Sequence, residues 1–363
     1  MTKKLYAAID VGTTTVAVSI IDENNIVAIR DGFLNPEKKY GSDVISRISN
    51  SLKNDNLKEM QFLIINAIKE SLITMLKRIG YDVSEPGLSK YIERIVIAAN
   101  TTMASIILGL SIESLGKSPF KMPFDSDKEI FLFGIKCYVL AGASAFIGAD
   151  VLGGAYSYCL KENESFMDLG TNGEMIVRSK EGYFATSSAC GPAFENCTRA
   201  KGIYGSTTLS NISFLLKRKI LNKDLILTKE QIRDGINCKG MVITADILRN
   251  IQLAVASVYA SYSMLLKEAG LSIDMIERLY IAGGFGFNMS LMDAVELGII
   301  PEKVKDKTCI IGNSSLKFAE EATFDTSKML GLNALRKEVN VINFGGNGEY
   351  QKLFEENLNF KRR

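Results

Sequence analysis

The sequence of 363 residues contains no histidine and no tryptophan. The absence of histidine excludes Ser/His/Asp and Cys/His nucleophilic sites, histidine-bearing zinc sites and histidine general bases within these residues. Chemistry here must depend on carboxylates, hydroxyls, backbone amides, Lys, Arg or a metal ion held by oxygen. A net charge of +2 and a pI near 8.1 give no basic surface for nucleic acid, so we expect no nucleic-acid partner.

Cysteine is scarce, and no two cysteines form a C-x-x-C pair. The six are Cys137, Cys159, Cys190, Cys197, Cys238 and Cys309. A secretion signal is also missing, because Asp10 interrupts the apolar stretch that follows Lys3 and Lys4 too early. We therefore expect a protein of the reducing cytoplasm whose thiols are mostly buried.

One stretch, residues 138–160, is nearly all apolar or small and reaches the length of ~20 residues that a membrane-spanning helix needs. Asp150 interrupts it, and its small side chains make it poorly hydrophobic. These small residues are Gly142, Ala143, Ser144, Ala145, Gly148, Gly153 and Gly154. The stretch predicts the end of a strand followed by a tightly packed helix, not a membrane segment.

The chain repeats itself. The residues Asp-Val-Gly-Thr-Thr at 10–14 recur as Asp-Leu-Gly-Thr-Asn at 168–172, each between apolar runs typical of strands. Two further pairs follow in the same order. Residues 94–100 resemble 278–284, and residues 137–142 resemble 309–314. Three matches in one order indicate two copies of an α/β unit, and we expect domains at 1–164 and 165–363, with the C-terminal helix able to pack on the first.

Amphipathic helical stretches fill the intervals between the repeated strands. We expect helices at residues 43–53, 57–78, 229–235 and 244–269.

Each Asp-x-Gly-Thr turn has the composition of a phosphate-binding hairpin. Glycine lets backbone N–H groups approach an anion closely, and threonine hydroxyls add donors. Asp10 and Asp168 at the strand ends are the predicted magnesium ligands and catalytic carboxylates. The predicted phosphate-contacting residues are Gly12, Thr13, Thr14, Thr15, Gly170, Thr171, Asn172 and Gly173. One such turn is usually an ordinary hairpin, but two at corresponding places favour phosphate binding.

Two further carboxylates are candidates for catalysis. Asp150 stands alone in the small-residue stretch, and Glu174 follows the second turn. Each is either a structural carboxylate or a group that holds magnesium through water or orients attacking water; the sequence leaves both interpretations open.

Several segments carry a resemblance to a known family. They are residues 35–36 and 40–48, 99–103, 108–110, 119–120, 168–174, 191–195 and 282–286. The hairpins and the Gly283-Gly284-Phe285-Gly286 loop resemble the actin/sugar kinase/chaperone superfamily. The whole set resembles the ATP-dependent reductive activators of corrinoid proteins. The resemblance implies a duplicated fold of ribonuclease H-like lobes with a nucleotide cleft between them, and it adds Asn100, Thr101, Gly191 and the 283–286 loop to the nucleotide-binding residues.

The resemblance also implies an activity and partners. Members of this family use ATP and Mg²⁺ to drive an electron onto the cobalt of a Co(II) corrinoid protein of a methyltransferase system, restoring Co(I). They typically carry a two-iron ferredoxin domain ahead of the ATPase part, whereas no cysteine precedes Cys137 here. We therefore expect a separate ferredoxin-like electron donor, or a chain that acts only as the ATP-driven half. Without histidine to bind cobalt, the corrinoid must arrive on its partner, and family members are often homodimers.

A shared iron–sulfur cluster at Cys190 and Cys197 is an alternative by analogy with the activators of 2-hydroxyacyl-CoA dehydratases. The spacing does not match, and Lys201 stands where a cysteine would be expected, so buried thiols are favoured and no cluster is expected.

Two other functions fit the same fold. A small-molecule kinase would need a base and a substrate signature that the sequence does not show, and would phosphorylate a metabolite from labelled ATP. A nucleotide-dependent switch or filament former would bind nucleotide without turnover.

Overall fold

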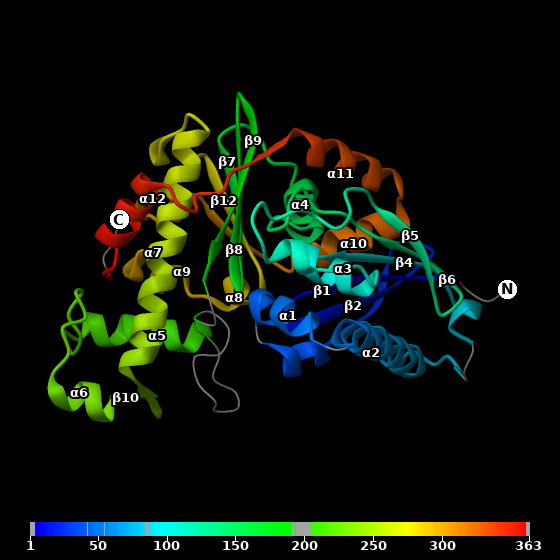
Figure 1. Ribbon diagram of the computed structural model, residues 1–363, viewed down its shortest axis with the longest axis horizontal. Helices are drawn as coiled ribbons and strands as arrows, with labels where there is room; N and C mark the ends of the chain where they lie inside the picture. The colour runs from blue at the N-terminus through cyan, green and yellow to red at the C-terminus, as the bar shows by residue number, and fades with distance from the viewer. Residues whose placement is uncertain are drawn as a thin grey trace. The chain divides into compact units, whose positions relative to one another are not determined.

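The computed structural model describes residues 4–41, 43–53, 55–83, 87–190, 193 and 205–360. The chain divides into two compact units (Figure 1). Unit 1 comprises Met1–Cys159 and Asn313–Val339, and unit 2 comprises Leu160–Gly312 and Asn340–Arg363. Each unit contains a six-stranded mixed sheet and a hydrophobic core of its own.

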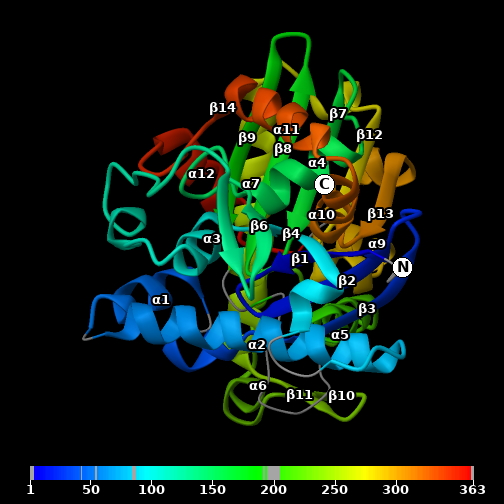
Figure 2. The ribbon, with the colours of Figure 1, turned by 90° about the vertical axis from the view of Figure 1, so that its right-hand side faces the viewer.

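The sheet of unit 1 has the order β3-β2-β1-β4-β6-β5 (Figure 2). Its strands are β1 (Leu5–Val11), β2 (Thr15–Asp22), β3 (Val27–Leu34), β4 (Ile92–Ala99), β5 (Lys128–Leu132) and β6 (Ile135–Val139). β1 pairs antiparallel with β2 and parallel with β4. The central strands are buried on both faces, which explains their nearly continuous apolar sequences.

The sheet of unit 2 has the order β13-β12-β7-β8-β9-β14. Its strands are β7 (Glu164–Leu169), β8 (Asn172–Ser179), β9 (Gly182–Ala189), β12 (Arg278–Ala282), β13 (Thr308–Gly312) and β14 (Val339–Val341). β7 and β8 form the antiparallel hairpin, and β12 lies parallel to β7, as β4 lies parallel to β1. The three repeats of the sequence are therefore confirmed as the pairs β1/β7, β4/β12 and β6/β13.

Helices flank both sheets. Unit 1 contains α1 (Val44–Ser51), α2 (Asn56–Arg78), α3 (Thr101–Ile107), α4 (Ala149–Ser157), α10 (Ser314–Phe324) and α11 (Ser327–Glu338). Unit 2 contains α5 (Gly205–Lys217), α6 (Lys229–Asp234), α7 (Ala245–Glu268), α8 (Gly284–Asn288), α9 (Leu291–Leu297) and α12 (Gly348–Glu356), with a small hairpin of β10 (Ile236–Cys238) and β11 (Met241–Ile243).

The four helices expected from the sequence are confirmed as α1, α2, α6 and α7. Side-chain caps fix where three of them begin. Asp43 accepts a hydrogen bond from the Ser46 N–H, Thr244 accepts one from the Ile247 N–H, and Thr228 and Gln231 form a capping box.

The small-residue stretch at 138–160 contains the end of β6 and the nine-residue helix α4. Among the helices in the described part of the chain, none combines the length and apolarity needed to cross a membrane. The small residues serve close helix packing: a Cβ at Gly153 would lie 2.6 Å from Cδ1 of the fully buried Phe318 on α10. The absence of a side chain at Gly153 thus lets α4 and α10 approach each other.

This contact predicts the effect of Gly153→Ala. Alanine is the better helix former by about 1 kcal/mol, but here it forces the Phe318 ring to move, so we expect a net loss of about 1–3 kcal/mol of unfolding free energy. Gly348→Ala is the control, because Gly348 begins α12 and has nothing within 4 Å of its Cβ position. Urea denaturation measures both; a Gly153→Ala protein as stable as the unmodified one would contradict the packing argument.

Candidate nucleotide and metal site

The first predicted hairpin turn lies between β1 and β2. The Gly12 N–H donates to the Thr15 carbonyl at 3.0 Å, and a Cβ at Gly12 would lie 2.8 Å from that same oxygen. The turn therefore requires glycine for its own geometry. Thr13 is buried, and its hydroxyl accepts a hydrogen bond from the Asn100 side chain at 3.1 Å. Two motifs predicted separately, the hairpin and the end of β4, thus meet in unit 1.

Asp10 is the next-to-last residue of β1, and its carboxylate lies against the start of α10. Asn313 Nδ2 donates to its Oδ2 at 2.7 Å, and Ser315 Oγ donates to its Oδ1 at 2.8 Å. Burial nevertheless raises the pKa of Asp10 above its usual value, although both hydrogen bonds act to lower it. Asn313 and Ser315 are not among the site residues predicted from the sequence. Asn313 is also the N-cap of α10. The Asn-Ser-Ser sequence at 313–315, directly after a repeated strand, is the pattern that could have indicated these two residues.

Asp150 lies in the first turn of α4, near Asp10. Burial raises its pKa to about 7, and the negative charge of Asp10 contributes to the rise. A Cβ at Gly148 would lie 2.5 Å from Asp150 Oδ1 and 2.6 Å from the Asn100 Cα, so β4 and α4 meet closely here. Two buried carboxylates that lie close together repel each other when both are ionised. A divalent cation bound between them would offset this repulsion.

The other candidates of unit 1 have structural contacts. Asn100 is the N-cap of α3 and accepts from the Met103 N–H at 2.9 Å. The buried hydroxyl of Thr101 donates to the Ser144 carbonyl at 2.7 Å. Thr14 is partly buried, and Thr15, at the start of β2, is exposed.

In unit 2, the loop after β12 lies directly against the second hairpin. Gly283 has a φ of +88°, and a Cβ there would lie 2.4 Å from Asp168 Oδ1 and 2.5 Å from the Leu169 carbonyl oxygen. Its N–H donates to the Gly312 carbonyl at 3.3 Å. Asp168 is paired with Glu174 across β7 and β8, so these two predicted carboxylates project from the same face of the sheet.

The predicted glycines of unit 2 fall into two groups. At Gly173 a Cβ would lie 2.7 Å from Ser188 Oγ, and at Gly286 it would lie 2.7 Å from Ile281 Cγ2, so the protein's own packing requires both. At Gly284 nothing lies within 4 Å, and at Gly170 the nearest atom is 4.0 Å away. The last two glycines leave room that a ligand can use.

Three further candidates in unit 2 are less open. Phe285 is buried in the core of unit 2, so only its backbone is available to a ligand. Thr171 is buried, and the Asn172 carbonyl accepts the Gly170 N–H at 2.9 Å.

The cysteines provide little metal-binding chemistry in the described ranges. Burial raises the pKa of Cys190 to about 12, and the nearby Glu174 charge contributes to the rise. Cys137, Cys190 and Cys238 are buried. In those parts of the chain that the structure describes, no three Cys, Asp or Glu side chains are grouped to hold a metal ion. Gly191 and Cys197 lie outside the described residues, as do Pro192, Phe194, Glu195 and Lys201.

Comparisons with known proteins identify the family to which the chain belongs. Residues 5–163 match the family described as "RACo middle region", and residues 162–204 and 196–363 match "C-terminal domain of RACo the ASKHA domain". The solved structure of a "Reductive activator for corrinoid,iron-sulfur protein" superposes with a TM-score of 0.87 at 23% identity, covering 99% of this chain and 67% of that one. This likeness confirms the fold class expected from the hairpins.

Two curated relatives carry names that concern corrinoid proteins. The "Corrinoid activation enzyme RamQ" of Eubacterium limosum is 25% identical over 382 residues, covering 86% of this chain and 63% of RamQ. The "[Co(II) methylated amine-specific corrinoid protein] reductase" of Methanosarcina barkeri is 26% identical over 140 residues, covering 39% of this chain and 25% of the relative. This chain thus spans less than two thirds of the length of either. Because both regions match in order, the chain belongs to the RACo family and contains its middle region and its C-terminal ASKHA domain.

Proposed function

We propose that this protein is a Mg-ATP-dependent ATPase that drives the reductive reactivation of a corrinoid methyl-carrier protein from Co(II) to Co(I). The corrinoid part rests on the family and on the names of its relatives. The nucleotide part rests on one observation above all: the carboxylate of Asp10, beside the turn between β1 and β2, is held in place by the side chains of Asn313 and Ser315.

Mg²⁺ fits the donor set of unit 1. It prefers carboxylate oxygens, and usually keeps several waters and phosphate oxygens as its remaining ligands, so a pair of carboxylates suffices. Asp10 and Asp150 would hold it there, and Asn313 and Ser315 fix the Asp10 carboxylate in place. Bound Mg²⁺ neutralises charge on the nucleotide phosphates.

We assign matching roles in unit 2. Asp168 would hold a metal ion through water or directly, and Glu174, on the same face of the sheet, would orient an attacking water. The open positions at Gly170 and Gly284 let the backbone approach the phosphates and the nucleoside. The turn at residues 12–15, with Asn100 behind it, binds phosphate in the same way.

The partners follow from the family and from residue chemistry. The cobalt arrives on a corrinoid protein, and this sequence contributes no histidine to it. We propose that the electron comes from a separate ferredoxin-like protein, whose low-potential iron–sulfur cluster would supply it. We further propose that the protein acts as a homodimer.

A reactivation assay tests the proposed activity directly. A Co(II) corrinoid methyl-carrier protein, a low-potential ferredoxin-like reductant and this protein are mixed anaerobically, with and without Mg-ATP. We expect the absorbance spectrum of Co(I) only when Mg-ATP is present. Controls omit this protein, or replace ATP by a non-hydrolysable analogue. Cobalt that stays Co(II) while ATP is hydrolysed would refute the corrinoid role and leave an ATPase with another partner.

Carboxylate variants test the metal site. Asp10→Asn and Asp168→Asn should each lower Mg-dependent ATP hydrolysis by at least about 100-fold, because each removes an anionic metal ligand from the reacting phosphates. Asp22→Asn is the control: Asp22 pairs with Leu5 at the opposite end of the β1–β2 hairpin and caps the Asn24 and Ile26 N–H groups. Normal hydrolysis in both site variants would show that the hairpins do not bind the metal.

A pair of glycine variants tests nucleotide approach. Gly284 begins α8 and Gly348 begins α12, and both have nothing within 4 Å of the Cβ position. We expect both Gly284→Val and Gly348→Val to fold with stability within about 0.5 kcal/mol of each other. Only Gly284→Val should weaken ATP binding, by about tenfold or more, since a branched side chain there blocks the ligand. Isothermal calorimetry measures this; equal affinities would remove Gly284 from the site.

A further inference from the structure

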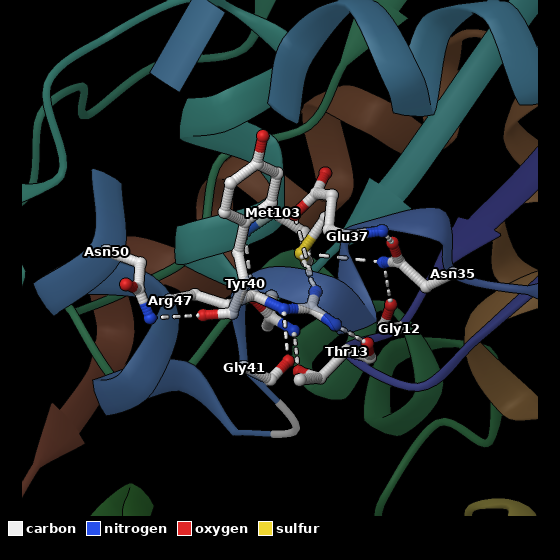
Figure 3. A network of polar contacts seen from close by, with 10 residues as sticks. Gly12, Thr13, Asn35, Glu37, Tyr40, Gly41, Arg47, Asn50 and Met103 are labelled. Carbon is white, nitrogen blue, oxygen red and sulfur yellow. Dashed lines mark hydrogen bonds and ion pairs between the residues drawn. The ribbon is translucent and has the colours of Figure 1, made fainter. Parts of the chain in front are cut away.

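One segment of unit 1, residues 35–47, carries part of the family resemblance but has no role in the chemistry described so far. It contains the 3₁₀ helix η1 (Pro36–Tyr40) and the start of α1. Figure 3 shows its polar side chains gathered against the turn at Gly12 and Thr13. The contacts of Asn35, Glu37 and Arg47 explain what this segment does.

Three consecutive carbonyl groups of the turn between β1 and β2 accept hydrogen bonds from this segment. Asn35 Nδ2 donates to the Gly12 carbonyl at 2.9 Å, and the Asn35 backbone N–H donates to the Thr14 carbonyl at 2.9 Å. Between them, Arg47 Nη2 donates to the Thr13 carbonyl (Figure 3). Two residues therefore hold every carbonyl from Gly12 to Thr14.

The direction of these bonds sets the direction of the N–H groups. In a trans peptide the C=O and the following N–H point to opposite sides of the chain. Holding the carbonyls of Gly12 and Thr13 toward Asn35 and Arg47 directs the N–H groups of Thr13 and Thr14 away from them. Successive N–H groups that point outward from a tight turn are the arrangement that binds anions.

Arg47 is itself fixed on all sides. It is fully buried, and it donates to the Gly41 carbonyl at 3.2 Å, to Glu37 Oε2 at 3.4 Å and to Met103 Sδ at 3.0 Å. The Glu37 N–H in turn donates to Asn35 Oδ1 at 2.9 Å. The three side chains thus form one connected network.

Apolar side chains would fill this part of the core at a lower cost in free energy than the buried network does. Glu37 is fully buried, its Oε1 has no hydrogen-bond partner in the described structure, and burial raises its pKa to about 7 although Arg47 acts to lower it. Buried ion pairs are often no more stabilising than apolar residues of the same volume. A role beyond stability accounts for keeping these charges beneath the turn.

We propose that Arg47 and Asn35 are positioning residues: they hold the carbonyls of residues 12–14 so that the turn presents its N–H groups to a nucleotide phosphate, with Glu37 holding the Arg47 guanidinium. The inference rests on the proposed nucleotide binding and deepens it. It assigns phosphate recognition to a network under the turn, and it predicts an effect on phosphate but not on nucleoside.

The test compares Arg47→Lys with Arg30→Met. Lysine keeps the charge but lacks the planar fork that reaches two carbonyls at once. Arg30 donates through Nε and Nη2 to the buried Glu320 carboxylate in the same unit and touches neither turn, so its variant controls for the loss of an ion pair. A double variant, Glu37→Gln with Arg47→Met, removes both charges together and guards against a fold lost to one unpaired buried charge.

Two measurements are made on each protein. The first is the dissociation constant for Mg-ATP and, separately, for adenosine. The second is amide hydrogen exchange in a peptide covering residues 10–16 of the ligand-free protein. We expect Arg47→Lys and the double variant to bind Mg-ATP about 10- to 100-fold more weakly, to bind adenosine as the unmodified protein does, and to exchange faster in the turn. Arg30→Met should match the unmodified protein in its affinity for Mg-ATP, its affinity for adenosine and its exchange rate in the turn.

The outcomes separate the positioning role from the function on which it rests. An unmodified protein that binds no Mg-ATP refutes the proposed function, and the positioning role with it. If the unmodified protein binds Mg-ATP, then unchanged ATP affinity in both Arg47 variants overturns the positioning role alone. So does an equal loss of ATP and adenosine affinity, because that pattern indicates a general loss of structure.

Discussion

The parallel pairing of β1 with β4 and of β7 with β12 is the constraint on which the rest of the candidate site depends. Parallel neighbours end at the same edge of a sheet, so the residue that follows one strand lies beside the residue that follows the other. In unit 1 this pairing places Asp10 beside Ala98, two residues before Asn100, and in unit 2 it places Asp168 against Gly283. Residues separated by about ninety to over a hundred positions in the chain thereby share one edge of each sheet.

The same edge of unit 1 concentrates negative charge. Asp10 receives two hydrogen bonds from the start of α10, and its charge raises the pKa of Asp150 at the start of α4. The close approach of α4 to α10 at Gly153 fixes the spacing of the two helices that carry these groups. The packing of small residues therefore affects the electrostatics of the site, because it sets the spacing of the helices that carry Asp150 and the hydrogen-bond donors to Asp10.

The two copies of the repeat place different residues around their corresponding turns and carboxylates. Gly12 is glycine because its own turn leaves no room, whereas Gly170 has open space around its Cβ position. Beside the first carboxylate the chain places Asn100, a helix cap, and beside the second it places Gly283, whose φ of +88° favours glycine. Five strands have the same order in both sheets, while the residues at the ends of the corresponding strands differ.

The sequence by itself determined the repeat, the strands within the repeated segments and the four helices whose apolar spacing was regular. These depend on local patterns: alternation in strands, a period of 3.6 in helices, and caps such as Asp43 and Thr244. The candidate carboxylates Asp10, Asp150, Asp168 and Glu174 could also be chosen from the sequence, because an isolated acid in an apolar or glycine-rich context is conspicuous.

Only the tertiary structure decided which of these groups meet. Asn313 and Ser315 contact Asp10 from about three hundred residues away, and no local pattern encodes that distance. Arg47 looks like an ordinary charged residue on an amphipathic helix, yet it is fully buried and bonds a carbonyl of the first turn. Burial and long-range contact are properties of the packed chain, because they depend on which surfaces the sheets and helices bring together.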